Sequence, residues 1–510
     1  MPSQIKDSKV HAQEFLKISN DFHLGHLPTE SRHPLTMDLS TLVKDHLTEA
    51  LTIMHKVDEA ALSKMLDYTA KIFSLHQDIQ TTLKKGHNIY LCGCGATGRL
   101  SLALESFYRE LYPHDSERVI SFMAGGDVAL IKSIESFEDH PEYGERQLLE
   151  LGFKDGDLLL AITEGGETPF VIGACQLAAK LSTVSKNYPY FIYCNPDESL
   201  KNIKRSHDVI HHPEIKKICL FVGPMSISGS TRMQASTVLM YGAGLALLEK
   251  FHSEAELKSK IQKEVELFRK LSYANLAFFI EQEAELYQKG HYLLYQTPKR
   301  LGLAVLTDTT ERSPTFSLAA FENGHDQNSQ LSLAYLTVDG TKDTLAAWEN
   351  ILYRKPRCLE WEHSVNRTGF NRLLGFDISA TSPRHNLHHQ QKFILSETVD
   401  GLHFSFMGQN INWELLGGSY LFKQVVLKVL LNTHSTLVMG KLNRYQGNIM
   451  TWVKPTNNKL IDRAARYVDY LLQDLKVSKT YEQIVFELFA TVDELPETES
   501  IVLTTVKRLK

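Results

Sequence analysis

A short apolar strand, a glycine-rich turn and a helix follow one another near residue 90 of this 510-residue chain. The strand spans residues 88–92, the turn reads Gly93-Cys-Gly-Ala-Thr-Gly-Arg99, and a helical pattern continues through Tyr108. This order of elements opens doubly wound sheets, in which helices cover both faces of a set of parallel strands. Further strands are expected in the same half of the chain, at residues 119–123, 158–162, 190–194 and 218–222.

The same alternation begins again after a charged helical stretch at residues 254–288. Placing Gly98 on Gly302 brings the two strand–turn–helix openings into register, so the two halves read as a diverged repeat. The second half is expected to contain strands at residues 291–295, 333–338, 373–378 and 393–395. Helices are expected from residue 301, at 341–352, at 413–442 and from 458 onward.

A chain of this length is too long for one hydrophobic core. The pattern therefore predicts an α/β fold with two doubly wound, flavodoxin-like parallel-sheet domains in tandem and a C-terminal helical lid. The expected parts are an extended N-terminal segment at residues 1–45, a first domain at 46–270, a second domain at 271–430 and the lid at 431–510.

The composition argues against several classes of function. The net charge is −5 and the sequence pI is near 6.5, so no basic surface is expected for nucleic acid or an anionic membrane. No apolar run approaches the roughly 18–20 residues that a membrane span needs, and the N-terminus lacks a signal-peptide pattern. Six cysteines in so long a chain do not suggest a disulfide framework. We expect a cytoplasmic protein.

Two patterns raise the question of a metal site. Cys92 and Cys94 form a C-x-C pair, and histidines gather at residues 211–212 and 385–389. Neither group has further acidic or cysteine partners at ligand spacing. We therefore expect no metal.

Glycine, serine and threonine residues follow several of the predicted strands in the first half. Such loops bind phosphate well, because glycine lets the backbone approach and hydroxyls and free amides at a helix start donate hydrogen bonds. A dinucleotide site is disfavoured, because no acidic residue closes a following strand at the expected distance. The second half has lost this chemistry: Leu301 and Leu303 stand where Thr97 and Arg99 are in the first. The candidate phosphate-binding residues are Gly95, Ala96, Thr97, Thr163, Ser228, Ser230 and Thr231.

The sequence 93–100 resembles the phosphate loop of the N-acetylmuramic acid 6-phosphate etherases and of the glucokinase regulatory protein family. The segments 124–126, 135–139, 168–171 and 228–233 are similar to the same families, and the resemblance spans nearly the whole chain. It implies the SIS (sugar isomerase) fold, a sugar 6-phosphate ligand and no cofactor. The tandem plan resembles the regulatory protein, which implies a phosphosugar sensor with a sugar kinase as its partner.

The resemblance also implies roles for acidic residues. It places the two glutamates of the etherases on Glu138, in the first domain, and Glu311, in the second, so that one complete site lies between the domains. Glu135 is expected beside Glu138 on one helical face, and Lys441 is expected to reach the site from the lid. The regulatory family uses acids at matching positions to hold sugar hydroxyls, so these carboxylates fit either role.

Three readings of the function stay open at this point. The first is a sensor that binds a sugar 6-phosphate, and the second is a lyase that releases lactate from N-acetylmuramic acid 6-phosphate. The third is an aldose–ketose phosphosugar isomerase, which needs only one base at C2. The chain departs from the families in the loops themselves. Ala96 stands where the etherases have serine or threonine, and Glu164 and Glu167 add acid to the second loop.

Overall fold

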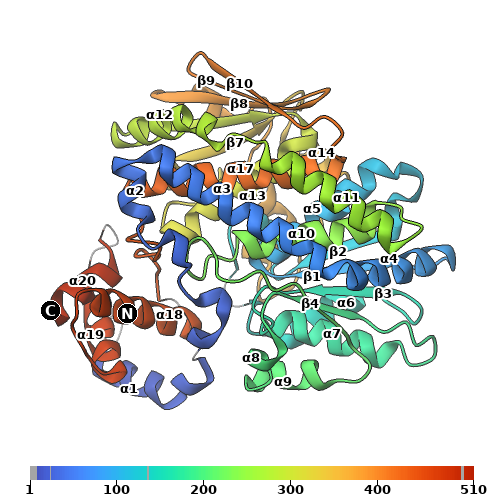
Figure 1. The fold of residues 1–510 in the computed structure, drawn as a ribbon, viewed down its shortest axis with the longest axis horizontal. Coiled ribbons are helices and arrows are strands. Elements are labelled where there is room, and N and C mark those ends of the chain that lie inside the picture. The colour runs from blue at the N-terminus through green and yellow to red at the C-terminus, as the bar shows by residue number, and fades with distance from the viewer. Residues whose placement is uncertain (1–7, 23, 135–136, 456, 496–498) are drawn as a thin grey trace.

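The computed structural model describes residues 8–22, 24–134, 137–455, 457–495 and 499–510. Two five-stranded sheets form within these residues, one in each half of the chain (Figure 1). Three long helices, α10 (Gln234–Leu248), α13 (Lys299–Phe316) and α17 (Tyr420–Lys441), lie between the two sheets and are largely buried. The predicted pair of α/β domains is confirmed.

The first sheet is entirely parallel, with the strand order β2-β1-β3-β4-β5. Alternate residues of its strands point to opposite faces: Leu91 joins the core under α5 and α10, and Tyr90 joins the core under α7. The doubly wound prediction for this half is confirmed. Its strands are β1 (Ile89–Gly93), β2 (Val119–Met123), β3 (Leu158–Ile162), β4 (Tyr190–Tyr193) and β5 (Lys216–Cys219). Its helices are α4 (Thr69–Lys84), α5 (Gly95–Leu111), α6 (Pro141–Glu150), α7 (Pro169–Leu181), α8 (Asp197–Leu200), α9 (Lys204–His211) and α10.

The second sheet repeats this topology only in part. Its first strand β6 pairs in parallel with β7 and β8, just as β1 pairs with β2 and β3. The remaining strands, β9 and β10, are antiparallel, giving the order β10-β9-β8-β6-β7. The strands are β6 (Tyr292–Thr297), β7 (Ala334–Val338), β8 (Gln390–Thr398), β9 (Gly401–Phe406) and β10 (Gln409–Glu414). The helices are α11 (Glu254–Arg269), α12 (Ala277–Gln288), α13, α14 (Thr344–Leu352), α15 (Val365–Thr368), α16 (Phe370–Leu374) and α17.

Two predicted elements of the second half are wrong. Residues 373–378 do not form a strand, because Leu373 and Leu374 are the last two residues of the short helix α16. The helix predicted from Trp413 begins only at Tyr420, because Trp413 lies in β10 and pairs with Leu402 of β9. The expected boundary at residues 430/431 falls inside α17, which is one continuous buried helix.

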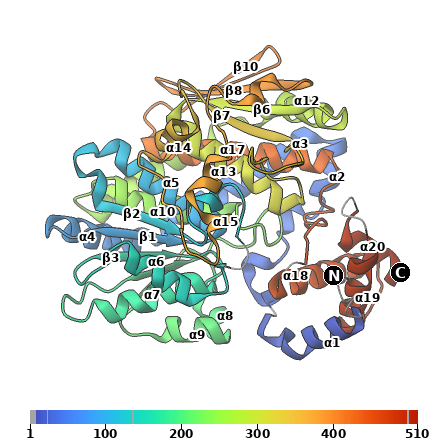
Figure 2. The ribbon, with the colours of Figure 1, turned by 180° about the vertical axis from the view of Figure 1, so that it is seen from behind.

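The two ends of the chain come together. Helix α1 (Ser8–Ile18) packs on α19, so the segment expected to be extended is helical in this part. Figures 1 and 2 show α1 beside the C-terminal helices, in a lobe next to the two sheets. The remaining helices are α2 (Leu39–Asp45), α3 (Leu47–Ser63), α18 (Asn458–Asp474), α19 (Tyr481–Glu494) and α20 (Ile501–Leu509). Within the described residues, no helix has the length and apolar character that crossing a membrane requires.

Candidate functional site

A cavity of about 860 Å³ opens where the two domains and the C-terminal lobe meet. Loops that follow β1, β3 and β5 form one side, α13 of the second domain forms another, and α18 with the segment before it forms a third. Among the predicted site residues, those that line the cavity are Gly95, Ala96, Thr97, Glu138, Thr163, Ser230, Thr231 and Glu311.

The turn after β1 becomes the start of helix α5. Gly95 is its first residue and has φ +52°, a left-handed conformation that glycine adopts without strain. The Thr97 hydroxyl accepts a hydrogen bond from the Cys94 amide at 3.1 Å and donates to the Cys94 carbonyl at 2.9 Å, which fixes the turn. The amides of Gly95 and Ala96 belong to the first turn of the helix, so they have no carbonyl partner within it. The positive end of this 17-residue helix therefore faces the cavity.

The other two loops differ in how they present their hydroxyls. Thr163 and Thr168 share a hydrogen bond of 3.0 Å at the cavity wall. Ser230 and Thr231 line the cavity, whereas Ser228 is fully buried outside its lining. The Ser228 backbone is held by Tyr467, whose hydroxyl donates to the Ser228 carbonyl at 2.5 Å. Ser228 therefore helps to hold the loop in place and does not face the cavity.

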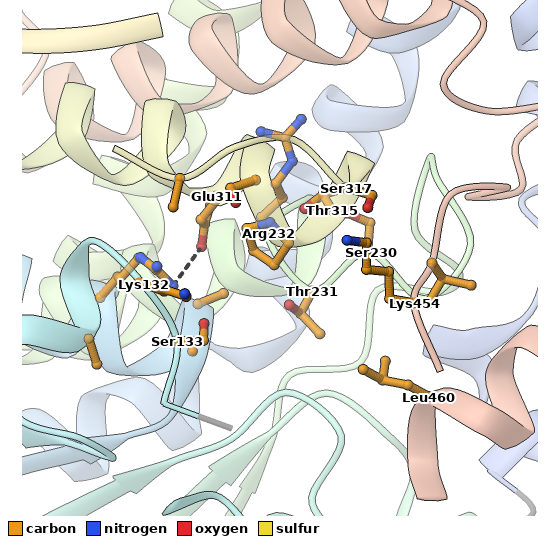
Figure 3. A pocket seen from close by; sticks show the side chains of 18 of the residues that line it. Lys132, Ser133, Ser230, Thr231, Arg232, Glu311, Thr315, Ser317, Lys454 and Leu460 are labelled. Atoms are coloured by element: carbon orange, nitrogen blue, oxygen red, sulfur yellow. Dashed lines mark ion pairs between the residues drawn. The ribbon is translucent and has the colours of Figure 1, made fainter. Parts of the chain in front are cut away.

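Glu311 enters the cavity from α13, opposite the first-domain loops (Figure 3). One of its carboxylate oxygens lies 4.0 Å from the guanidinium of Arg99, and its Oε2 is buried without a hydrogen-bond partner among the described residues. Burial raises the pKa of Glu311, although the positive charges of Arg99 and Arg232 oppose the rise. A residue of the second domain thus lines the same cavity as the first-domain loops that the sequence predicts to bind phosphate.

A buried ion pair fixes the helix that carries Glu311. Asp308, one turn earlier, accepts hydrogen bonds from Arg232 at 3.1 Å and from Arg312 at 2.8 Å. The hydroxyl of Ser435 on α17 donates to Asp308 at 2.7 Å. Because Arg232 follows directly on the Ser230–Thr231 loop, this network locks the third loop to α13.

The lid contributes a different lysine from the one predicted. Lys459, in the first turn of α18, binds Glu167 at 2.6 Å and Glu138 at 3.3 Å. Lys441 lies away from the cavity, where its ammonium donates to the Lys44 carbonyl at 3.4 Å. Its predicted contact with the site is therefore wrong.

The two first-domain glutamates of the sequence prediction have separate outcomes. Glu138 itself lies in a turn before α6. Its side chain is one-third exposed at the cavity rim. Glu135 lies outside the described residues.

Several cavity residues were missed by the sequence prediction. Lys132 and Ser133 come from the segment after β2, Thr315 and Ser317 from the end of α13, and the rest from the C-terminal part (Figure 3). Nothing in a local pattern marks these residues, because they meet only when distant segments fold together. The C-terminal residues are Arg444, Lys454, Asn457, Lys459 and Arg463. No group of side chains suited to hold a metal ion occurs among the residues that the structure describes.

Comparison with known proteins points to one family. The family model of the glucokinase regulatory protein N-terminal SIS domain matches residues 71–179. The N-acetylmuramic acid 6-phosphate etherase of Salmonella schwarzengrund is 30% identical over 217 residues, which are 42% of this chain and 67% of that protein. This chain belongs to the SIS-domain family. The etherase of Caldanaerobacter subterraneus subsp. tengcongensis is 31% identical over 214 residues.

The match is strongest in one part of this SIS-domain protein. The chain spans 64% of the length of the Caldanaerobacter etherase, and the alignment takes up 42% of the chain, less than the near-complete resemblance expected. Solved structures show weaker likeness. The tagatose-6-phosphate ketose/aldose isomerase of Escherichia coli matches with a TM-score of 0.34 at 12% identity, covering 54% of this chain and 65% of that one. The C-terminal domain of a Francisella tularensis glucosamine-fructose-6-phosphate aminotransferase matches with 0.41 at 12%, covering 78% and 96%.

Proposed function

We propose that the cavity binds a sugar 6-phosphate and that the protein is a phosphosugar sensor. The observation that carries the proposal is the start of α5, where the free amides of Gly95 and Ala96 face the same cavity as the hydroxyls of Ser230 and Thr231. Backbone donors and a helix dipole at one point form a site for a phosphoryl group. The relatives named for N-acetylmuramic acid 6-phosphate support a ligand of this class.

The sugar part of the ligand would extend from α5 toward α13. Glu311 and Glu138 line the cavity on opposite domains, and carboxylate oxygens accept hydrogen bonds from sugar hydroxyls. Lys459 from the C-terminal lobe neutralises Glu138 and Glu167 beside this path. A bound sugar phosphate would therefore touch both domains and the lobe at once.

This arrangement supports a regulatory role. A ligand that contacts three parts of the chain stabilises the arrangement in which all three are in contact, and it can shift the surface seen by another protein. The matching family model is named for a regulator of glucokinase, so the partner we propose is a sugar kinase. We place the protein in the reducing cytoplasm, where its six free thiols would persist.

Binding is tested by thermal denaturation with fructose 6-phosphate, fructose and inorganic phosphate. At 100 times its dissociation constant, fructose 6-phosphate is expected to stabilise the native state by about 2.7 kcal/mol. Fructose, which lacks the anion, should produce no shift at the same concentration. Equal shifts with fructose and fructose 6-phosphate would refute a phosphate-directed site.

A lyase is the second candidate, because Glu138 and Glu311 both reach the cavity. One carboxylate would remove the C2 proton of N-acetylmuramic acid 6-phosphate, and the other would protonate the leaving oxygen of lactate. The raised pKa of buried Glu311 suits the acid, and Glu138, which is paired with Lys459, would be the base. An isomerase would need only a base at C2, and no further observation favours it.

Measuring the lactate released from N-acetylmuramic acid 6-phosphate distinguishes the sensor proposal from the lyase proposal. The sensor proposal expects no lactate from N-acetylmuramic acid 6-phosphate, although this sugar phosphate should still stabilise the protein. Lactate production that disappears in both Glu138→Gln and Glu311→Gln would establish the lyase. Lactate that persists in both variants would point to a contaminating enzyme.

A further inference from the structure

Glu164 is a buried acid on the cavity wall that forms no ion pair with any residue the structure describes. The residue is 5% exposed, it lies between Thr163 and Gly165 in the loop after β3, and its Oε2 makes no hydrogen bond among the described residues. Its backbone carbonyl accepts from the Cys194 amide at 3.0 Å, which fixes the residue against the end of β4. A carboxyl group this deeply buried needs either a counter-charge or a proton.

The cations whose charges act on Glu164 already pair with other carboxylates. Arg463 on α18 binds Glu30 at 2.6 Å, and Lys459 binds Glu167 at 2.6 Å. Glu167 also pairs with Arg205 at 2.9 Å, and Glu30 with Arg466 at 3.2 Å.

The groups whose charges act on Glu164 come from three directions: Glu30 from the N-terminal segment, Lys459 and Arg463 from α18, and Glu167 from its own loop, with the thiol of Cys194 beside it. Two acids that hold their own cations therefore surround a third that has none.

We infer that Glu164 is kept as a neutral carboxylic acid and donates a hydrogen bond to an anionic oxygen of the bound sugar phosphate. The inference rests on the proposed function and adds a specificity-determining residue to it. A protonated carboxyl is a donor, whereas an ionised one only accepts and would repel a phosphoryl dianion. An acidic residue in a phosphate-binding loop is then explained, because Glu164 donates a hydrogen bond to the ligand as long as it is protonated.

Burial, and after it the charge of Glu30, raises the pKa of Glu164 to about 8, with Lys459 and Arg463 opposing the rise. The neutral form therefore predominates at pH 7 and the ionised form at pH 9. The second pKa of a phosphate ester is about 6, so the ligand itself is a dianion at both values. If only the neutral form binds, the apparent dissociation constant at pH 9 should be about tenfold higher than at pH 7.

The test is calorimetric titration of fructose 6-phosphate into the whole chain at pH 7 and pH 9. The unaltered protein should bind about tenfold more weakly at pH 9. Glu164→Gln keeps a donor that cannot ionise, so its affinity should match the unaltered protein at pH 7 and change less than about twofold at pH 9. Glu142→Gln, at an exposed acid outside the cavity, should keep the tenfold change. Circular dichroism and melting curves verify that the variants are folded.

Three results would overturn the inference. If Glu164→Gln keeps the tenfold change, another group causes it, and the first suspect is Lys428, whose pKa burial lowers to about 8. If Glu164→Gln abolishes binding while the unaltered protein prefers glucosamine 6-phosphate at pH 9, the ionised acid binds an ammonium group. If the unaltered protein binds equally at both pH values, only this inference fails, whereas no binding at pH 7 means that the proposed function fails as well.

Discussion

Ala96→Asp is expected to bind fructose 6-phosphate at least about 100-fold more weakly than the unaltered protein. Ala96 is the second residue of α5, and its amide is one of the donors assigned to the phosphoryl group. A carboxylate placed there repels the phosphate, and two charges 4 Å apart interact by about 4 kcal/mol in a partly screened site. Calorimetry or the thermal shift described above measures the loss.

Misfolding would not explain such a loss. An acidic residue in the first turn of a helix interacts favourably with the helix dipole, so the Asp variant should be at least as stable as the unaltered chain. Ala96→Asn is the matched control, with nearly the same shape and no charge, and it should lose far less affinity. Ala96→Ser restores the hydroxyl found in the etherases and should bind at least as well. Equal affinity in the Asp and Asn variants would contradict a phosphoryl group at this position.

Glu105→Gln should cost the native state about 3–5 kcal/mol, the typical penalty for leaving buried charges unpaired. Glu105 is buried on α5, where it binds Arg109 at 2.9 Å and, from the second domain, Arg354 at 3.1 Å and Arg357 at 2.8 Å. Neutralising it leaves three arginines around an uncharged amide. Differential scanning calorimetry should record a fall in melting temperature of about 5 °C or more.

The matched control is Glu117, an exposed acid that binds the same arginine, Arg109. Glu117 binds Arg109 at 2.7 Å, but its side chain is 80% exposed, so Glu117→Gln should change stability by less than about 1 kcal/mol.

Burial opposes the ionisation of Glu105, yet Arg354 and Arg357 outweigh it and lower its pKa to about 2. The stability it contributes is present above its ordinary pKa near 4.5 and is lost as pH falls toward 2. The difference between Glu105→Gln and the unaltered protein should therefore shrink below pH 4.5. A constant difference down to pH 2 would contradict this account.

The order of strands and helices in the first half was predictable, because each strand is a short apolar run followed by a turn rich in glycine or polar residues. The second half was harder to predict. The strands β9 and β10 were missed because His403, Asn410 and Asn412 alternate with apolar residues, a half-exposed strand pattern that differs from the continuous apolar runs of the first sheet. The repeat was visible through Gly98 and Gly302, which both lie in the first turn of a helix that packs closely on a neighbouring element.

The residues of the site likewise fall into those that the sequence predicted and those that it did not. Residues at the ends of strands were predictable, because carboxyl ends of parallel strands meet at one edge of the sheet. The contribution of Glu311 followed from a motif of the resembling family. Lys459 was missed in favour of Lys441, since the choice depends on how α18 docks, and no local pattern encodes that. The position of Glu138 in a turn likewise depends on contacts of its backbone, which accepts from the Phe170 amide.

A crystal structure of the protein with fructose 6-phosphate would decide whether a single anion site joins the two domains. We expect the phosphoryl oxygens within hydrogen-bonding distance of the Gly95 and Ala96 amides, and hydroxyls of the same molecule directed toward Glu311. A phosphoryl group bound elsewhere, or a sugar that contacts the first-domain loops without approaching α13, would contradict a shared site.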